Sequence, residues 1–89
     1  MGQILWTDYL RYRAQLRGFE PAAVEQIVLF SDERYFDGET QRRVAVGRDG
    51  SQFVMIPYDQ DGETFTPITI HATTRQQINL RLRTGRFKP

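Results

Sequence analysis

The stretch QRRVAVGRDGSQFVMIPYD, residues 41–59, decides the fold because apolar side chains alternate on both sides of one turn signal. Val44 and Val46 recur every second residue, which is the period of a β-strand. Asp49-Gly50 is typical of a tight hairpin turn, so the stretch predicts two antiparallel strands. In the second arm, Phe53, Met55 and Pro57 alternate with Val54, Ile56 and Tyr58.

Helical spacing precedes the hairpin. LWTDYLRYRAQLRGF, residues 5–19, predicts a first helix with Thr7 as its N-cap and Gly18 as its end. PAAVEQIVLF, residues 21–30, predicts a second helix, since a proline suits the first turn. The apolar stripes are Leu5, Tyr9, Tyr12 and Leu16 in the first helix, and Val24, Ile27 and Val28, continuing towards Phe30, in the second.

The remaining segments complete an α+β pattern. RYFDG, residues 34–38, is a short strand candidate, and TFTPITIHA, residues 64–72, predicts a fourth strand with an edge-like or irregular start at Pro67. A final helix is expected over about residues 73–84, capped by Thr73 or Thr74 and ended by Gly85. The order ααββββα predicts one domain, residues 1–89, in which two N-terminal helices and a C-terminal helix pack on a twisted, four-stranded, mainly antiparallel sheet.

Composition excludes several classes of protein. The 89 residues include no cysteine and one histidine, so the sequence offers no disulfide framework, thiolate zinc site or histidine-rich metal site. We expect no metal and no cofactor. The apolar stretches are far shorter than the roughly 20 residues needed to span a bilayer. We therefore expect a soluble, cytoplasmic protein that does not enter a membrane.

Charge is distributed unevenly along the chain. The net charge is only +1, yet the ends are basic and residues 20–63 hold ten of the eleven acids. Eleven of the twelve cations are arginine, whose planar fork matches phosphate. The closing segment HATTRQQINLRLRTGRFKP, residues 71–89, carries five cations and no acid. This polarity favours an anionic ligand or an acidic partner at the C-terminal end.

His71 is the candidate for proton transfer, because it stands where the last strand leads into the last helix. Free backbone N–H groups at a helix start favour bound anions. On the predicted helix Arg75, Asn79 and Arg83 share a polar face, whereas Ile78 and Leu82 point inward and Leu80 points elsewhere. A histidine beside arginines can cleave RNA without a metal, through attack by the ribose 2′-OH. The alternative is an ordinary strand-end histidine that hydrogen-bonds a backbone carbonyl.

Other candidate groups have simpler interpretations. Tyr35, Phe36 and Tyr58 could stack on bases, but aromatic residues in strands usually pack in a core. The acids of residues 59–63 lack the spacing of a calcium loop and fit a hairpin turn. Direct DNA binding is the least favoured function, because no helix-turn-helix pair precedes the last helix and the acidic middle would repel a duplex.

The element order and three short segments resemble the BrnT-like toxins of type II toxin–antitoxin modules, small members of the wider RelE-like ribonuclease fold. The segments are Arg17-Gly18-Phe19 before the second helix, Arg43-Val44-Ala45-Val46-Gly47 in a strand, and Ile70-His71-Ala72 followed by Arg75. Family members commonly carry a Lys-His pair before the glycine; here Leu16-Arg17 stands there, so a general base from the first helix is missing.

The resemblance implies a metal-independent endoribonuclease toxin that a co-encoded antitoxin neutralises. It assigns Arg43 and Arg75 to phosphate binding or transition-state stabilisation, with His71 at the junction of that site. We expect RNA-binding residues on one basic surface around them, and a homodimer or a hetero-oligomer with the antitoxin. The alternative is a non-catalytic interaction subunit of the same fold. The RNA-binding candidates are Arg17, Asn79, Arg81, Arg83 and Arg86.

Overall fold

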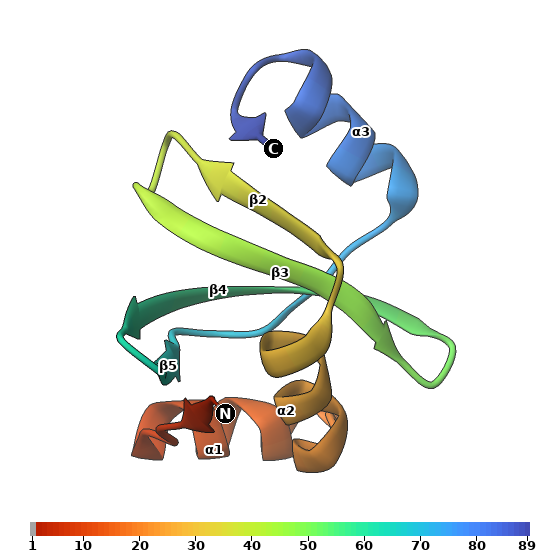
Figure 1. Ribbon diagram of the computed structural model, residues 1–89. Coiled ribbons are helices and arrows are strands. Elements are labelled where there is room, and N and C mark those ends of the chain that lie inside the picture. The colour runs from red at the N-terminus through yellow and green to blue at the C-terminus, as the bar shows by residue number, and fades with distance from the viewer. Residues whose placement is uncertain (1) are drawn as a thin grey trace.

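The hairpin expected from residues 41–59 forms the centre of the sheet in the computed structural model, which describes residues 2–89 (Figure 1). Its arms are β3, Arg42–Asp49, and β4, Gln52–Asp61, and they pair antiparallel from Arg43 opposite Tyr58 to Asp49 opposite Gln52. Gly50 lies in the turn with a φ of 62°, a left-handed conformation that glycine adopts without a steric penalty. The sequence prediction of this hairpin is confirmed.

The sheet is larger than the predicted four strands. In the described residues it has seven strands in the order β1-β5-β4-β3-β2-β7, with β6 also paired to β4. It is mixed rather than antiparallel throughout, because β1 runs parallel to β5. The expected strand over 64–72 is broken after Pro67 into two short strands. The further strands are β1, Gln3–Ile4; β2, Glu33–Asp37; β5, Thr64–Pro67; β6, His71–Ala72; and β7, Phe87–Lys88.

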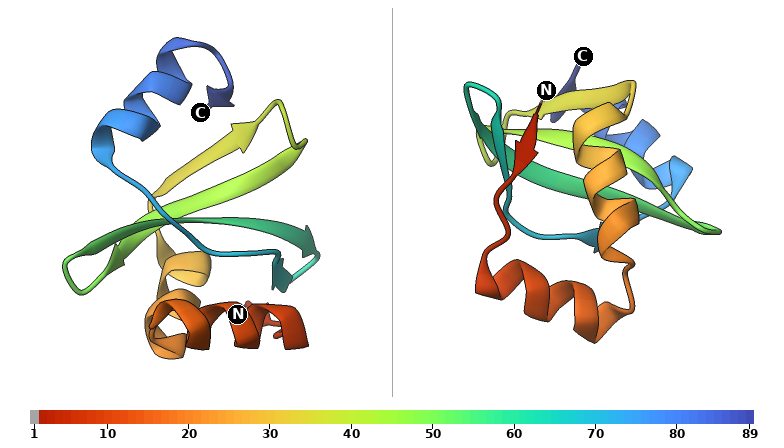
Figure 2. Two further views of the ribbon diagram at one scale, coloured as in Figure 1. Left: turned by 180° about the vertical axis from the view of Figure 1, so that it is seen from behind. Right: turned by 60° about the horizontal axis from the view of Figure 1, so that its bottom comes forward.

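Within residues 2–89, three helices cover the two faces of the sheet. α1, Asp8–Arg17, and α2, Pro21–Phe30, lie on one face, and α3, Arg75–Arg83, lies on the other (Figures 1 and 2). The predicted caps are present: the side chains of Thr7 and Thr74 accept hydrogen bonds from the helix backbones that follow them. No helix within residues 2–89 is long and apolar enough to cross a membrane.

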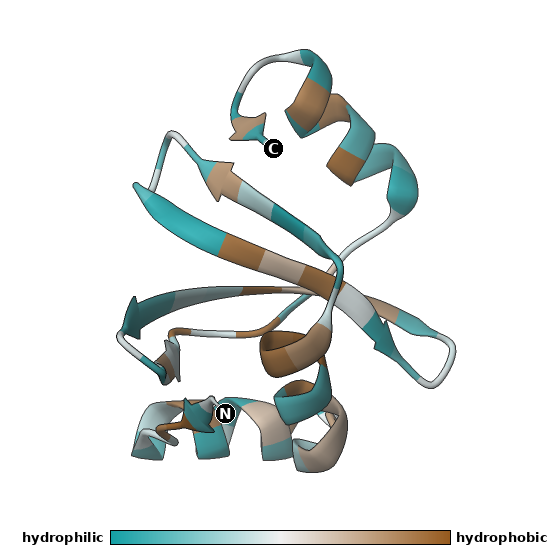
Figure 3. Ribbon diagram, viewed as in Figure 1, coloured by the Kyte–Doolittle hydropathy of each residue, from teal (hydrophilic) through white to brown (hydrophobic). Residues whose placement is uncertain are grey.

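Alternation along the hairpin gives the molecule two apolar layers. Ala45, Val54 and Ile56 face α1 and α2, whereas Val44 and Val46 belong to the layer that also includes Ile78 of α3 and Phe87. Figure 3 shows the apolar middle of β3 between the helices. α2 packs closely on this strand: a Cβ on Gly47 would come within 2.7 Å of Ile27 Cγ1. The glycine therefore permits a contact that a larger residue would prevent.

α1 contacts the core through a narrow side that differs from the apolar stripe in its sequence. Leu10 and Ala14 are buried, while Tyr9, Tyr12 and Leu16 are 55, 60 and 62% exposed. Phe30 at the end of α2 is also exposed. The stripe that predicts the helix is therefore not the side that contacts the core. Half-exposed aromatic and leucine side chains remain on its outer surface.

Candidate functional site

His71 lies on β6 at the point where the sheet leads into α3. Its backbone pairs with Met55 of β4, and three residues later Thr74 caps α3. Seen from behind, the segment that contains β6 crosses from β5 towards α3 (Figure 2). The junction predicted from the sequence is therefore present. It is half-buried at the edge of the sheet rather than on an exposed loop.

The side chain of Arg13, on α1, makes polar contacts with this junction. Its Nε donates to the backbone carbonyl of Ile70 at 3.1 Å, and its Nη2 lies 3.3 Å from Nδ1 of His71. A guanidinium has only donors, so Nδ1 must accept and the imidazole carries its proton on Nε2. The contact therefore selects one neutral tautomer of His71.

The surroundings of His71 disfavour its charged form. Burial lowers the pKa of His71 below its ordinary value of 6.5, and the positive charges of Arg13, Arg81 and Arg17 lower it further. The imidazole is therefore neutral at physiological pH. A neutral imidazole near several arginines can accept a proton while the arginines attract an anion.

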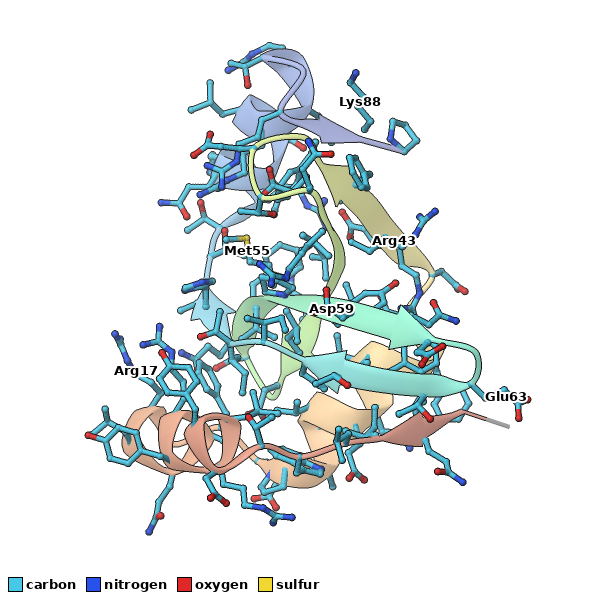
Figure 4. All side chains as sticks on the ribbon, turned by 90° about the vertical axis from the view of Figure 1, so that its left-hand side faces the viewer. Arg17, Arg43, Met55, Asp59, Glu63 and Lys88 are labelled. Carbon is cyan, nitrogen blue, oxygen red and sulfur yellow. The ribbon has the colours of Figure 1, made fainter. Side chains whose placement is uncertain are left out.

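A small cleft opens beside this imidazole. The cleft has a volume of about 140 Å³, and we call it the His71 cleft. Arg17 stands on the α1 side of the molecule near β6, with its guanidinium away from the core (Figure 4). The cleft has space for a phosphate-sized anion between α1 and the sheet edge. Its lining residues are Arg13, Arg17, Phe19, Ile70, His71 and Ala72.

The guanidinium of Arg75 already forms an ion pair with an acidic side chain. Its Nη1 and Nη2 donate to the two carboxylate oxygens of Glu33 at 2.6 and 2.9 Å, and its guanidinium lies over the Phe53 ring. The hydrogen bonds from Arg75 lower the pKa of Glu33, although burial opposes the shift, and Tyr35 donates to the same carboxylate. Phosphate binding by Arg75 therefore requires competition with Glu33.

The sheet register places Arg75 on the same face as His71. Glu33 pairs with Val46, Val46 with Met55, and Met55 with His71, so these residues form one row across four strands. With a spacing of about 4.8 Å between strands, Glu33 and His71 lie about 14 Å apart. The Arg75–Glu33 pair is thus a neighbour of the His71 cleft, not part of its wall.

Arg43 is placed elsewhere. Because Arg43 alternates with Val44, it lies on the α1–α2 face, and it pairs with Tyr58, three residues along β4 from Met55, the partner of His71. It borders a separate polar hollow of about 330 Å³ together with Phe36, Tyr58 and Asp59. Arg17 and Arg43 stand on opposite sides of Figure 4. The structure therefore does not bring all the predicted arginines onto one surface.

The C-terminal cations also differ in their roles. Arg86 forms a forked pair with the buried carboxylate of Asp37, with both nitrogen–oxygen distances at 3.1 Å. Arg81 is half-buried over the Phe87 ring. Asn79 and Arg83 are exposed on α3, and Ile78 is buried, as the helical spacing predicts. Arg86 therefore ties β7 to β2, while Asn79 and Arg83 remain open to solvent.

Sequence reasoning missed the role of Arg13, whose side chain contacts the His71 imidazole. The available signal was its spacing of four residues from Arg17, which places both on one side of α1. Glu33 was missed as well, because nothing local predicts its pairing with a residue 42 positions away. Residues 2–89 contain no group of three or more histidine or acidic side chains arranged to hold a metal ion.

Comparisons with known proteins add no functional assignment to this geometry. No protein family matches the chain, and neither the curated proteins nor the solved structures include a significant match.

Proposed function

We propose that this chain is the toxin of a type II toxin–antitoxin module and that it cleaves RNA without a metal ion at the His71 cleft. The observation that carries the proposal is the neutral His71 imidazole held by Arg13 beside Arg17. This set combines a proton acceptor with two cations, which can activate the 2′-OH and stabilise charge on the phosphoryl oxygens.

Arg13 links substrate binding to the basicity of His71. In the free protein its Nη2 donates to Nδ1 and occupies that lone pair. A phosphate in the cleft offers the guanidinium charged oxygens, which make stronger hydrogen bonds than a neutral nitrogen. When Arg13 turns to the phosphate, Nδ1 of His71 becomes free to take the proton of the 2′-OH.

The reaction forms one bond and breaks one. The ribose 2′-oxygen attacks phosphorus as His71 accepts its proton, the bond to the 5′-oxygen breaks, and that oxygen takes a proton from solvent. The products are a 2′,3′-cyclic phosphate and a 5′-hydroxyl. Arg13 and Arg17 stabilise the charge that grows on the phosphoryl oxygens, and the positive field of Arg81 favours the same state.

The RelE-like fold and the antitoxin partner belong to the same proposal. They are supported by the α+β architecture, by the position of His71 before α3, and by the resemblance of the three short segments. Arg75 would bind RNA only after leaving Glu33, and Arg43 borders a separate hollow, so neither contributes to our proposed reaction. Leu80, half-exposed on α3, is available to a homodimer or an antitoxin.

Controlled expression in bacterial cells tests the proposal. Induction of the parent protein should arrest growth and fragment cellular RNA, whereas His71→Ala and Arg17→Gln variants that accumulate to the same level should not. Arg42→Gln is the matched control, because it removes a surface arginine that pairs with Asp59 and does not line the cleft. Normal growth and intact RNA with the soluble parent protein would exclude the toxin function.

A second candidate, a non-catalytic interaction subunit of the same fold, has an observation in its favour. Arg13 covers Nδ1 of His71, and Glu33 neutralises Arg75, so both groups are satisfied without a ligand. This candidate predicts a tight complex with the product of a neighbouring gene and no RNA cleavage. Under it, His71→Ala would leave assembly unchanged, whereas Leu80→Asp would weaken it.

A further inference from the structure

α1 carries an unpartnered row of aromatic and aliphatic side chains on its outer side. Tyr9, Tyr12 and Leu16 are 55, 60 and 62% exposed, although their spacing is that of a core-facing stripe. We call these three residues the α1 stripe; Leu5, which the sequence pattern also included, precedes the helix. The side chains of Tyr9 and Tyr12 are open to solvent, and the core contacts of the helix come instead from Leu10 and Ala14.

The α1 stripe lies directly beside the arginines of the His71 cleft. Tyr9, Arg13 and Arg17 are spaced by four residues and form one row along the helix, and Tyr12 and Leu16 form the adjacent row. A group bound by Arg13 is therefore one helical turn from the Tyr9 ring. A polymer with a phosphate in the cleft can therefore place its neighbouring units over the stripe.

Charge decides which polymer fits. The ten residues of α1 include three arginines and one acid, Asp8, so the helix attracts an anion. Exposed aromatic rings alternating with cations are the combination that single-stranded nucleic acids require, because the rings stack on bases while the cations hold phosphates. The tyrosine hydroxyls can remain in water while the ring faces are covered.

We propose that the α1 stripe is a stacking platform for single-stranded RNA: Tyr9 and Tyr12 each hold a base next to the phosphate bound by Arg13 and Arg17. The choice of ligand rests on the function proposed above. The platform adds a substrate requirement to it: unpaired nucleotides on one side of the cleaved bond. Leu16 lies at the end of the row and offers the bound RNA an apolar contact.

Binding of a non-cleavable ligand tests the platform without relying on catalysis. The probe is a fluorescein-labelled oligouridine of about ten nucleotides with 2′-O-methyl groups, which block 2′ attack, and its counterpart is an abasic chain with the same phosphates. Tyr9→Ala and Tyr12→Ala should each weaken binding of the oligouridine about 10-fold, within the range measured for base–aromatic stacking. Binding of the abasic chain should not change.

Two matched variants complete the experiment. Tyr12→Phe keeps the ring and should bind the oligouridine like the parent. Phe30→Ala removes an equally exposed ring at the end of α2 and should have no effect. Equal binding by the parent and both alanine variants would overturn the platform, and so would equal losses with the two probes. A parent dimer that Tyr12→Ala dissociates would assign the stripe to a second copy of the chain.

The two proposals can fail separately. If unmodified RNA is cleaved but the tyrosine variants bind like the parent, the platform is wrong and the ribonuclease stands. If oligouridine binding depends on the tyrosines but no RNA is cleaved, the platform stands and the ribonuclease is wrong.

Discussion

Arg13 reaches from α1 to His71, 58 positions later in the chain, and places its Nη2 3.3 Å from Nδ1 of the imidazole. The same guanidinium caps the carbonyl of Ile70, an edge group of the sheet. One side chain thus fixes the helix to the sheet edge and sets the tautomer of the only histidine. The structural and chemical roles of Arg13 are therefore joined in one contact.

The stability of the fold should fall as the pH drops below the ordinary pKa of histidine. Burial and nearby arginines lower the pKa of His71 in the folded chain, so the unfolded state binds more protons as the pH falls through 6.5. The stability from neutral His71 is fully present above that value and is lost progressively below it. The urea midpoint should be lower at about pH 5.5 than at about pH 7.5. In His71→Gln that difference should shrink; an unchanged difference would contradict the assignment.

Truncating a side chain on the buried side of α1 should lower the stability of the fold, whereas truncating one on the exposed side should not. Leu10→Ala removes a fully buried side chain and should lower the free energy of unfolding by about 2–5 kcal/mol. Leu16→Ala, the same change on the 62% exposed side, should stay within about 0.5 kcal/mol. Urea unfolding of the purified variants measures both. A larger loss from Leu16→Ala would mean that α1 packs with the stripe that its sequence suggests.

Arg86 should matter for stability and Arg83 should not. Arg86→Gln leaves the Asp37 carboxylate, only 3% exposed, without its forked partner, and should lower the free energy of unfolding by about 1–3 kcal/mol. Arg83→Gln changes an exposed residue and should stay within about 0.5 kcal/mol. Thermal unfolding of the pair distinguishes them. Equal stability of the two variants would show that Arg86 does not anchor the C-terminus.

Glu33 should restrain RNA binding by Arg75. Glu33→Gln removes the carboxylate that accepts both guanidinium hydrogen bonds, so Arg75 becomes available to a phosphate. The affinity for single-stranded RNA should increase, and the slope of log affinity against log salt should steepen by about one. Asp61→Asn is the control, because it makes the same charge change at the far end of β4. Identical slopes for the two variants would exclude a role for Arg75.

The sequence predicts the parts of the fold that local patterns determine. Asp49-Gly50 between two alternating runs specifies the hairpin, and Thr7, Gly18 and Thr74 delimit helices through their caps. The strands β1 and β7 have two residues each, too few to show a period. Their pairing depends on tertiary contact, so the four-stranded prediction undercounts the sheet.

The candidate site is predictable only in part, for a similar reason. His71 stands at a strand end before a capped helix, which is a local feature, and its place is confirmed. The approach of Arg13 depends on which side of α1 faces the sheet, and the apolar stripe predicts the other side. Arg43 pairs with Tyr58, three residues along β4 from the partner of His71, and therefore borders a different hollow. Long-range register, not composition, decides which charged residues meet.

Cleavage of a chemically defined RNA by the purified protein tests the central claim most directly. In the presence of a metal chelator, the parent should cut a single-stranded RNA and leave a 2′,3′-cyclic phosphate and a 5′-hydroxyl. It should not cut the same oligonucleotide when the nucleotide 5′ of the cleaved bond lacks its 2′-OH. His71→Gln should be slower by at least about 100-fold, the contribution of a general base. An intact RNA, or equal cutting of the 2′-deoxy oligonucleotide, would contradict the account.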